Sequence, residues 1–197
     1  IPRGYLVDEL DPEVAAGFEA AVARLSAAGA AISDISLDIL EDLRPANRPK
    51  SIVSAEAFAI HRDQLAARRE GYDPYVATRL DGGSDILAAD YIAMHRERDA
   101  TCAAVQAVTR PFDALLLPTS PCVTPKIAPL DTTEALMKAS ARVLRNTALS
   151  NYLDRPTITI PCHRAGEAPV GLSLMGSRHH DRRLLAIAAG VEGIVRG

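Results

Sequence analysis

Three apolar, β-prone runs that each stop at a proline or a glycine constrain the fold of this chain most strongly. They lie within residues 113–122, 151–162 and 168–176. Runs of this composition predict short strands, and the proline or glycine at each end predicts a rigid loop there. We expect the strands themselves over residues 114–117, 157–160 and 170–175. Loops at strand ends are where functional sites are commonly built, so these loops are the first candidates for a site.

The first 37 residues predict a strand, a helix and a second strand. Asp11 and Pro12 mark the start of the helix, with Asp11 as the capping residue and Pro12 at the first helical position. Apolar residues then recur at helical spacing, and Gly29 supplies a left-handed stop. Residues 31–37 alternate apolar and polar side chains, as a half-buried strand does. A right-handed crossover between two parallel strands is the expected arrangement of this unit.

Further helical tracts separate the remaining strands. Asp81-Gly-Gly-Ser-Asp85 predicts a turn between two of them, and the loop over residues 118–129 contains four prolines, which make it stiff. We expect helices over residues 52–69, 88–109 and 133–144, and from residue 181 onward. This alternation of strands and helices predicts an α/β layer fold.

Composition narrows the classes of function. The 197 residues carry a net charge of −3 and no tryptophan, which argues against binding a nucleic acid. No apolar run approaches the roughly 20 residues that span a bilayer. Three widely spaced cysteines fit neither a disulfide framework nor a paired metal site, and reduced thiols are typical of the cytoplasm. We therefore expect a cytoplasmic protein without a metal or cofactor.

The runs Asp113-Ala-Leu-Leu-Leu-Pro-Thr-Ser-Pro121 and Pro169-Val-Gly-Leu172, in this order, resemble the C-terminal half of the amidase signature family. The resemblance implies a mixed, largely parallel sheet flanked by helices on both faces. It also implies cleavage of amide bonds by a Ser-Ser-Lys triad, which in the family lies in a glycine- and serine-rich core nearer the N-terminus. Asp81-Gly-Gly-Ser-Asp85 lacks the second serine and the flanking glycines of that core. Residues 1–197 are therefore expected to be the C-terminal part of a single amidase domain, with the catalytic half outside this chain.

One motif departs from the family pattern. The family usually shows Asn-x-x-Gly-x-Pro, whereas this chain has Asn151-Tyr-Leu-Asp154-Arg-Pro156. Aspartate in place of glycine is expected to remove easy access to positive φ and to add a charge near the pocket. Together with the Pro-Cys-His that ends at His163, the motif resembles the branch that acts on small urea-like substrates such as biuret derivatives.

The resemblance suggests seven substrate-binding residues, each with a simpler structural alternative. The proline-rich loop lies near the acyl pocket in the family, Arg145 could hold a carboxylate or act as a helix C-terminal cation, and Asn151 could orient the site or only bond its own backbone. His163 could donate to the substrate or be a surface residue, whereas neighbouring Cys162 is expected to be a buried filler. The seven candidates are Thr119, Ser120, Cys122, Arg145, Asn151, Asp154 and His163.

The function implied is hydrolysis of a small amide by serine acyl transfer, with the triad on the part of the domain outside this chain. Two other functions stay open: a non-catalytic binding or scaffold module, and one component of an ammonia-producing amidotransferase. The expected partners are a small amide substrate, the N-terminal half of the same enzyme, and a second copy or a small accessory subunit.

Overall fold

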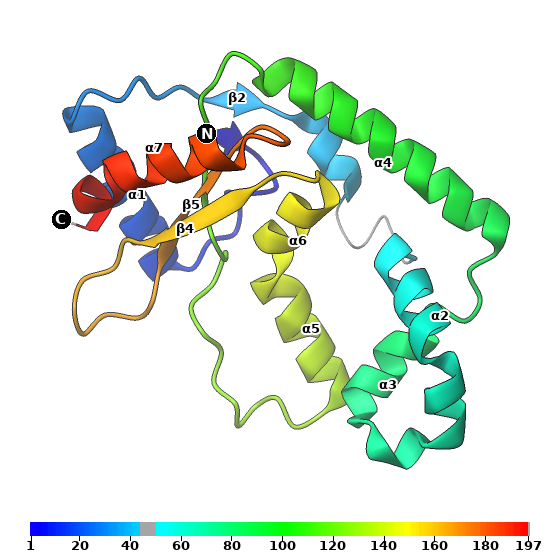
Figure 1. Cartoon of the computed structure of the whole chain (residues 1–197). Coiled ribbons are helices and arrows are strands. Elements are labelled where there is room, and N and C mark those ends of the chain that lie inside the picture. The colour runs from blue at the N-terminus through cyan, green and yellow to red at the C-terminus, as the bar shows by residue number, and fades with distance from the viewer. Residues whose placement is uncertain (44–49, 197) are drawn as a thin grey trace.

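The first segment of the chain folds into the expected strand, helix and strand. The computed structural model describes residues 1–43 and 50–196 (Figure 1). In it, β1 (Pro2–Arg3) pairs in parallel with β2 (Ile35–Ser36), and α1 (Pro12–Ala27) connects them. Gly29 has a φ of 97°, the left-handed conformation predicted for the end of the helix. The parallel crossover is thus confirmed, with strands shorter than the sequence pattern indicates.

A second sheet has three strands and lies at the centre of the molecule. It consists of β3 (Leu115–Pro118), β4 (Thr157–Pro161) and β5 (Gly171–Met175), in the order β3-β5-β4 with both pairs antiparallel. The mixed α/β class is confirmed, but parallel pairing among the described strands is confined to β1 and β2. The reason is the short connection over residues 162–170, because a parallel pair needs a crossover of about a dozen residues or more.

Helices cover both faces of the three-stranded sheet. On one face, Leu172 and Leu174 belong to a buried cluster with Phe18 of α1 and Leu184 of α7 (Asp181–Arg196). On the other face, Leu117 and Met175 lie in a second cluster with residues of α4 and α6. Side chains of a strand alternate between the faces, so a strand between two helical layers is apolar on both sides at the positions that the helices cover.

The remaining helices form an arm beside the sheet and a support in front of it (Figure 1). In the arm, Arg69 and Asp81 form an ion pair at 2.5 Å across the connection between two helices. Two helices were not expected from the sequence, namely α3 and α6, and α6 carries several candidate site residues. The bounds are α2 (Ile52–Ala67), α3 (Pro74–Asp81), α4 (Ala88–Thr109), α5 (Thr133–Val143) and α6 (Arg145–Tyr152), with 3-10 turns at Asp38–Leu43 and Arg69–Gly71.

None of the helices among the described residues has both the length and the apolar character needed to cross a membrane.

Candidate functional site

Three hydroxyl side chains meet on one face of the central sheet, where β3 and β4 end and β5 begins. Ser173 Oγ lies 2.8 Å from Thr119 Oγ1 and 3.2 Å from Thr159 Oγ1, and the two threonine oxygens are 3.1 Å apart. The strand register explains the meeting, because Thr159 is paired with Ser173 and the Thr119 amide donates to the Gly171 carbonyl at 2.9 Å. We call Thr119, Thr159 and Ser173 the hydroxyl cluster, and this end of the sheet the loop end.

The hydroxyl cluster has spare capacity to accept hydrogen bonds. Each hydroxyl has one proton and two lone pairs, so a closed ring of three bonds uses every proton and leaves three lone pairs. Ser173 is buried, Thr119 is half-buried and Thr159 is exposed, so the ring opens to the surface through Thr159. Such a ring is suited to N–H donors, and amide nitrogens are donors of that kind.

Close packing at Gly171 explains the glycine in the Pro-Val-Gly-Leu run. A Cβ at this position would lie 2.5 Å from Thr159 Cγ2 and 2.7 Å from Thr119 Oγ1, closer than atoms of real side chains approach. The glycine is therefore required by the hydroxyl cluster beside it, rather than by a left-handed backbone.

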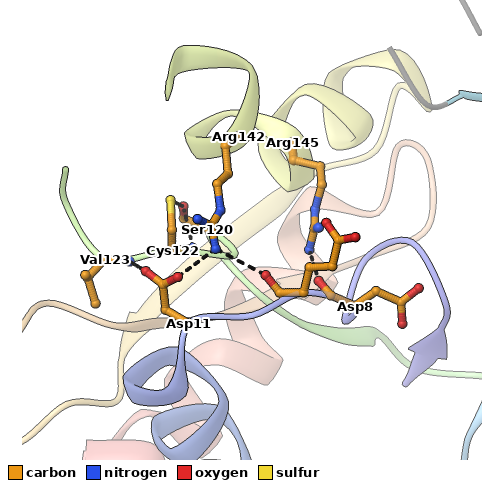
Figure 2. A network of polar contacts seen from close by, with 8 residues as sticks. Asp8, Asp11, Ser120, Cys122, Val123, Arg142 and Arg145 are labelled. Atoms are coloured by element: carbon orange, nitrogen blue, oxygen red, sulfur yellow. Dashed lines mark hydrogen bonds and ion pairs between the residues drawn. The ribbon is translucent and has the colours of Figure 1, made fainter. Parts of the chain in front are cut away.

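The proline-rich loop is tied to the rest of the molecule by polar contacts (Figure 2). The Asp11 amide donates to the Pro121 carbonyl at 2.9 Å, and the Val123 amide donates to Asp11 Oδ2 at 3.0 Å. Arg142 of α5 donates to Asp11 Oδ1 at 2.6 Å. Asp11 does occupy the N-cap position of α1, but its side chain makes no capping bond. The expected capping role is thus corrected, because the loop and Arg142 take both carboxylate oxygens.

Within this loop, Ser120 and Cys122 lie beside one another. Ser120 Oγ is 3.7 Å from Cys122 Sγ and 3.5 Å from the Cys122 amide nitrogen, which donates to it. Both residues are half-buried. Across the described residues no serine hydroxyl bonds a lysine, and the Nζ of Lys50 pairs instead with Asp85 at 3.3 Å. Ser120 therefore has no base here that could activate it as a nucleophile.

Arg145 and its neighbour Asn146 hold the backbone that leads into α1. Arg145 Nη2 donates to the carbonyl of Asp8 at 2.9 Å, and its guanidinium lies 5.4 Å from the ring centre of Tyr5. Arg145 is the first residue of α6, so it is not a cation at the C-terminus of its own helix. Asn146 is buried, and its Nδ2 donates to the carbonyls of Leu6 at 3.0 Å and Pro118 at 2.7 Å.

His163 and Cys162 lie just beyond the end of β4. The Val170 amide donates to His163 Nδ1 at 3.2 Å, so the imidazole braces the connection between β4 and β5. Cys162 is buried, its amide donates to the Val170 carbonyl at 2.9 Å, and burial raises the pKa of its thiol. The prediction that Cys162 is a buried filler is confirmed.

Asn151 and Asp154 lie at the opposite end of β4 from His163. The strand between them has five residues, which corresponds to roughly 16 Å at about 3.3 Å per residue. Asn151 is exposed in the last turn of α6, and its carbonyl accepts from the Asp154 amide at 3.2 Å. The seven candidates therefore do not form one cluster: Thr119, Ser120, Cys122 and His163 share the loop end, whereas Arg145 faces the segment before α1 and Asn151 and Asp154 lie beyond the far end of β4.

Asp154 adopts the conformation that glycine adopts easily. Its φ is 53°, and its Oδ2 pairs with Arg178 Nε at 2.5 Å. The interpretation that aspartate removes positive φ at this position is wrong, because a short polar side chain tolerates the left-handed region. The ion pair with Arg178 is consistent with aspartate being kept here.

Replacing Asp154 with glycine should therefore leave the fold intact, with a change in the free energy of unfolding of less than about 1 kcal/mol. Relief of the left-handed strain offsets the loss of an exposed ion pair. Asp154→Val should destabilise the protein by about 1–3 kcal/mol, because a β-branched residue is strained at positive φ. Urea unfolding of both variants measures the difference, and equal stabilities would contradict the assignment of strain to this position.

Sequence reasoning missed Thr159, Ser173 and Asn146 as parts of this region. The signal for Thr159 and Ser173 was present: each alternates with apolar residues along its strand, which places the hydroxyls on the face opposite Leu172 and Leu174. Asn146 had no such signal, because its role depends on two carbonyls far away in the sequence. No group of three or more His, Cys, Asp or Glu side chains within residues 1–43 and 50–196 is arranged to hold a metal ion.

The model of the family described as Amidase matches residues 1–185. The chain belongs to the amidase family. Among its relatives is the 2-amino-5-chloromuconic acid deaminase of Comamonas testosteroni, which is 31% identical over 99% of this chain and 42% of its own length. Another relative is the A-type component of the glutamyl-tRNA(Gln) amidotransferase of Desulforamulus reducens, which is 27% identical over 98% of this chain and 44% of its own length.

Comparison of structures agrees with membership of the amidase family. The urea amidolyase of Kluyveromyces lactis superposes with a TM-score of 0.84 and 23% identity, over 98% of this chain and 12% of that one. At this identity the similarity establishes the fold, and it confirms the mixed α/β class. The chain spans less than half the length of these curated relatives.

Proposed function

We propose that this protein hydrolyses the C–N bond of a small amide by serine acyl transfer, and that residues 1–197 form the C-terminal part of the amidase domain. The observation that carries the proposal is the hydroxyl cluster at the loop end of the sheet, in a chain of the amidase family. Relatives in this family include amidases and a deaminase, which act on carbon–nitrogen bonds.

The chemistry divides between two parts of the domain. The resemblance assigns the attacking serine, the second serine and the lysine to the part outside this chain, where backbone N–H groups would stabilise the oxyanion. This chain would supply one wall of the pocket, built from Thr119, Ser120, Cys122 and His163. Thr159 would accept a hydrogen bond from the substrate nitrogen and so orient the amide for attack.

A groove on the other side of α1 supports the division. Its volume is about 660 Å³, and apolar side chains such as Val7, Phe18, Val22 and Ile32 line much of it. An apolar groove of this size is suited to packing against further polypeptide. We propose that the N-terminal part of the same domain packs there, so that this chain by itself has no amidase activity.

Ammonia release by the full-length protein tests the proposal, with simple aliphatic amides and biuret as substrates. Thr159→Val should lower kcat/KM by about three- to tenfold, since one hydrogen bond is lost without a change in shape. Thr157→Val on the same strand is the matched control, because Thr157 lies outside the hydroxyl cluster. Equal kcat/KM for Thr159→Val and the wild type would remove the hydroxyl cluster from the pocket.

The second candidate is one component of an ammonia-producing amidotransferase, favoured by the similarity to the amidotransferase component of Desulforamulus reducens over 98% of this chain. The same assay separates the two functions. A hydrolase releases ammonia alone, whereas an amidotransferase component should release it only when a second polypeptide is present. A non-catalytic module should release none under either condition.

A further inference from the structure

We propose that Asp11, oriented by Arg142, is a positioning residue that fixes the conformation of residues 119–123 at the loop end. The inference rests on the proposed function only where it treats this segment as a wall of the substrate pocket. The contact itself joins three elements that are distant in sequence: the start of α1, the proline-rich loop and α5 (Figure 2).

Asp11 pairs with the loop much as a neighbouring strand would. Its amide donates to the Pro121 carbonyl at 2.9 Å, and its carboxylate accepts from the Val123 amide at 3.0 Å. One residue thus satisfies a carbonyl and an amide that lie two residues apart in the loop. The side chain takes the place that a backbone carbonyl would have in a sheet, so the loop is held without a second strand.

The composition of the loop makes this contact important. Proline has no N–H, and the loop over residues 118–129 contains four prolines, so it has few amides with which to anchor itself. Val123 supplies one of these amides. At the other end of the segment, Asn146 Nδ2 holds the Pro118 carbonyl at 2.7 Å. Thr119, Ser120 and Cys122 therefore lie between two side-chain anchors.

Two further features show that Asp11 is specialised for the loop. It occupies the N-cap position of α1, where an aspartate normally bonds the first turn, yet its oxygens bind Val123 and Arg142 instead. Glu9, two residues earlier, has a φ of 51°, and its carbonyl accepts from Arg142 Nη2 at 3.3 Å. Arg142 therefore holds both the carboxylate and the strained turn that leads to it.

The thiol of Cys122 reports on the loop directly. In the full-length protein, alkylation by iodoacetamide can be followed at each cysteine by mass spectrometry of its peptide. We expect Asp11→Ala to speed alkylation of Cys122 about tenfold, because the Val123 amide loses its acceptor. Asp11→Asn should restore the rate to within about threefold of wild type, because the amide oxygen of asparagine can still accept from Val123.

Cys102 and Cys162 are internal controls in the same experiment. Burial raises the pKa of both thiols, which keeps them slow to react, and both residues lie outside the loop. Asp113→Ala removes another Asp–Arg ion pair, the one with Arg183, and should leave all three rates unchanged. Equal Cys122 rates in Asp11→Ala and wild type would overturn the proposal. Faster alkylation of all three cysteines in Asp11→Ala would also overturn it, since that result shows general unfolding.

Kinetics then separate this proposal from the proposed function. If the segment is a pocket wall, Asp11→Ala should lower kcat/KM for the amide substrate and Asp11→Asn should recover it. If Cys122 reacts faster in Asp11→Ala while kcat/KM is unchanged, the anchor is real and the pocket wall is misassigned. A loss of kcat/KM that asparagine does not recover, with unchanged Cys122 reactivity, would contradict the positioning role.

Discussion

Replacing Asn146 with alanine is expected to lower the free energy of unfolding by about 2–4 kcal/mol. The side chain is 1% exposed and donates to the carbonyls of Leu6 and Pro118, which the substitution leaves without this donor. Each buried carbonyl that loses its partner costs about 1–3 kcal/mol, and the cavity adds to that cost. Urea unfolding followed by circular dichroism measures the change.

The same helix offers a matched control for this prediction. Asn151 lies one and a half turns further along α6 and is exposed, so Asn151→Ala should change the free energy of unfolding by no more than about 0.5 kcal/mol. A similar small effect for Asn146→Ala would show that the two carbonyls do not depend on it. If Asn151 nonetheless binds substrate, its substitution should reduce kcat/KM while stability is unchanged, which separates its two interpretations.

The second large effect is expected at Gly171. Gly171→Val places a branched side chain where even a Cβ would lie 2.5 Å from Thr159 Cγ2, so the strands must separate or the threonines must leave their rotamers. Overpacking of this kind costs about 1–3 kcal/mol, and the hydroxyl cluster should be disrupted at the same time. We therefore expect a lower urea midpoint together with a loss of amidase activity in the full-length protein.

A second glycine substitution tests whether the effect comes from close packing. Gly190 lies in α7 with no atom within 4 Å of the position of an added Cβ. Gly190→Ala should therefore stabilise the protein by about 0.5–1 kcal/mol, because alanine favours a helix more than glycine does. Destabilisation by both substitutions would argue against crowding as the cause at Gly171.

Much of the secondary structure follows from local patterns. The boundaries of α4 agree with the expected range over residues 88–109, and α1, α2, α5 and α7 begin at the predicted positions. Each of these helices has a clear start or a regular apolar spacing, which are properties of neighbouring residues. By contrast, α3 and α6 have eight residues each, too short for a periodic pattern to emerge.

The site was harder to predict because it depends on contacts between distant residues. The candidate residues of the proline-rich loop and His163 were found from motifs, and the structure places them at one end of the sheet. Asn151 and Asp154 were grouped with them because both precede the same strand, but the length of β4 separates the two groups. Asp11 was interpreted as a helix cap, which its immediate neighbours favour, and only the folded chain shows that Val123 and Arg142 bind it.

The sequence by itself determined the strand-forming runs, most of the helices and membership of the amidase family, because these depend on residues close together or on motifs read in order. Only the tertiary structure decided which hydroxyls meet, why residue 171 is glycine and what Asp11 and Asn146 hold. Those features join residues as many as 140 positions apart, as in the bond from Asn146 to Leu6. Such contacts exist only after strand register and helix packing have brought the segments together, so no local pattern encodes them.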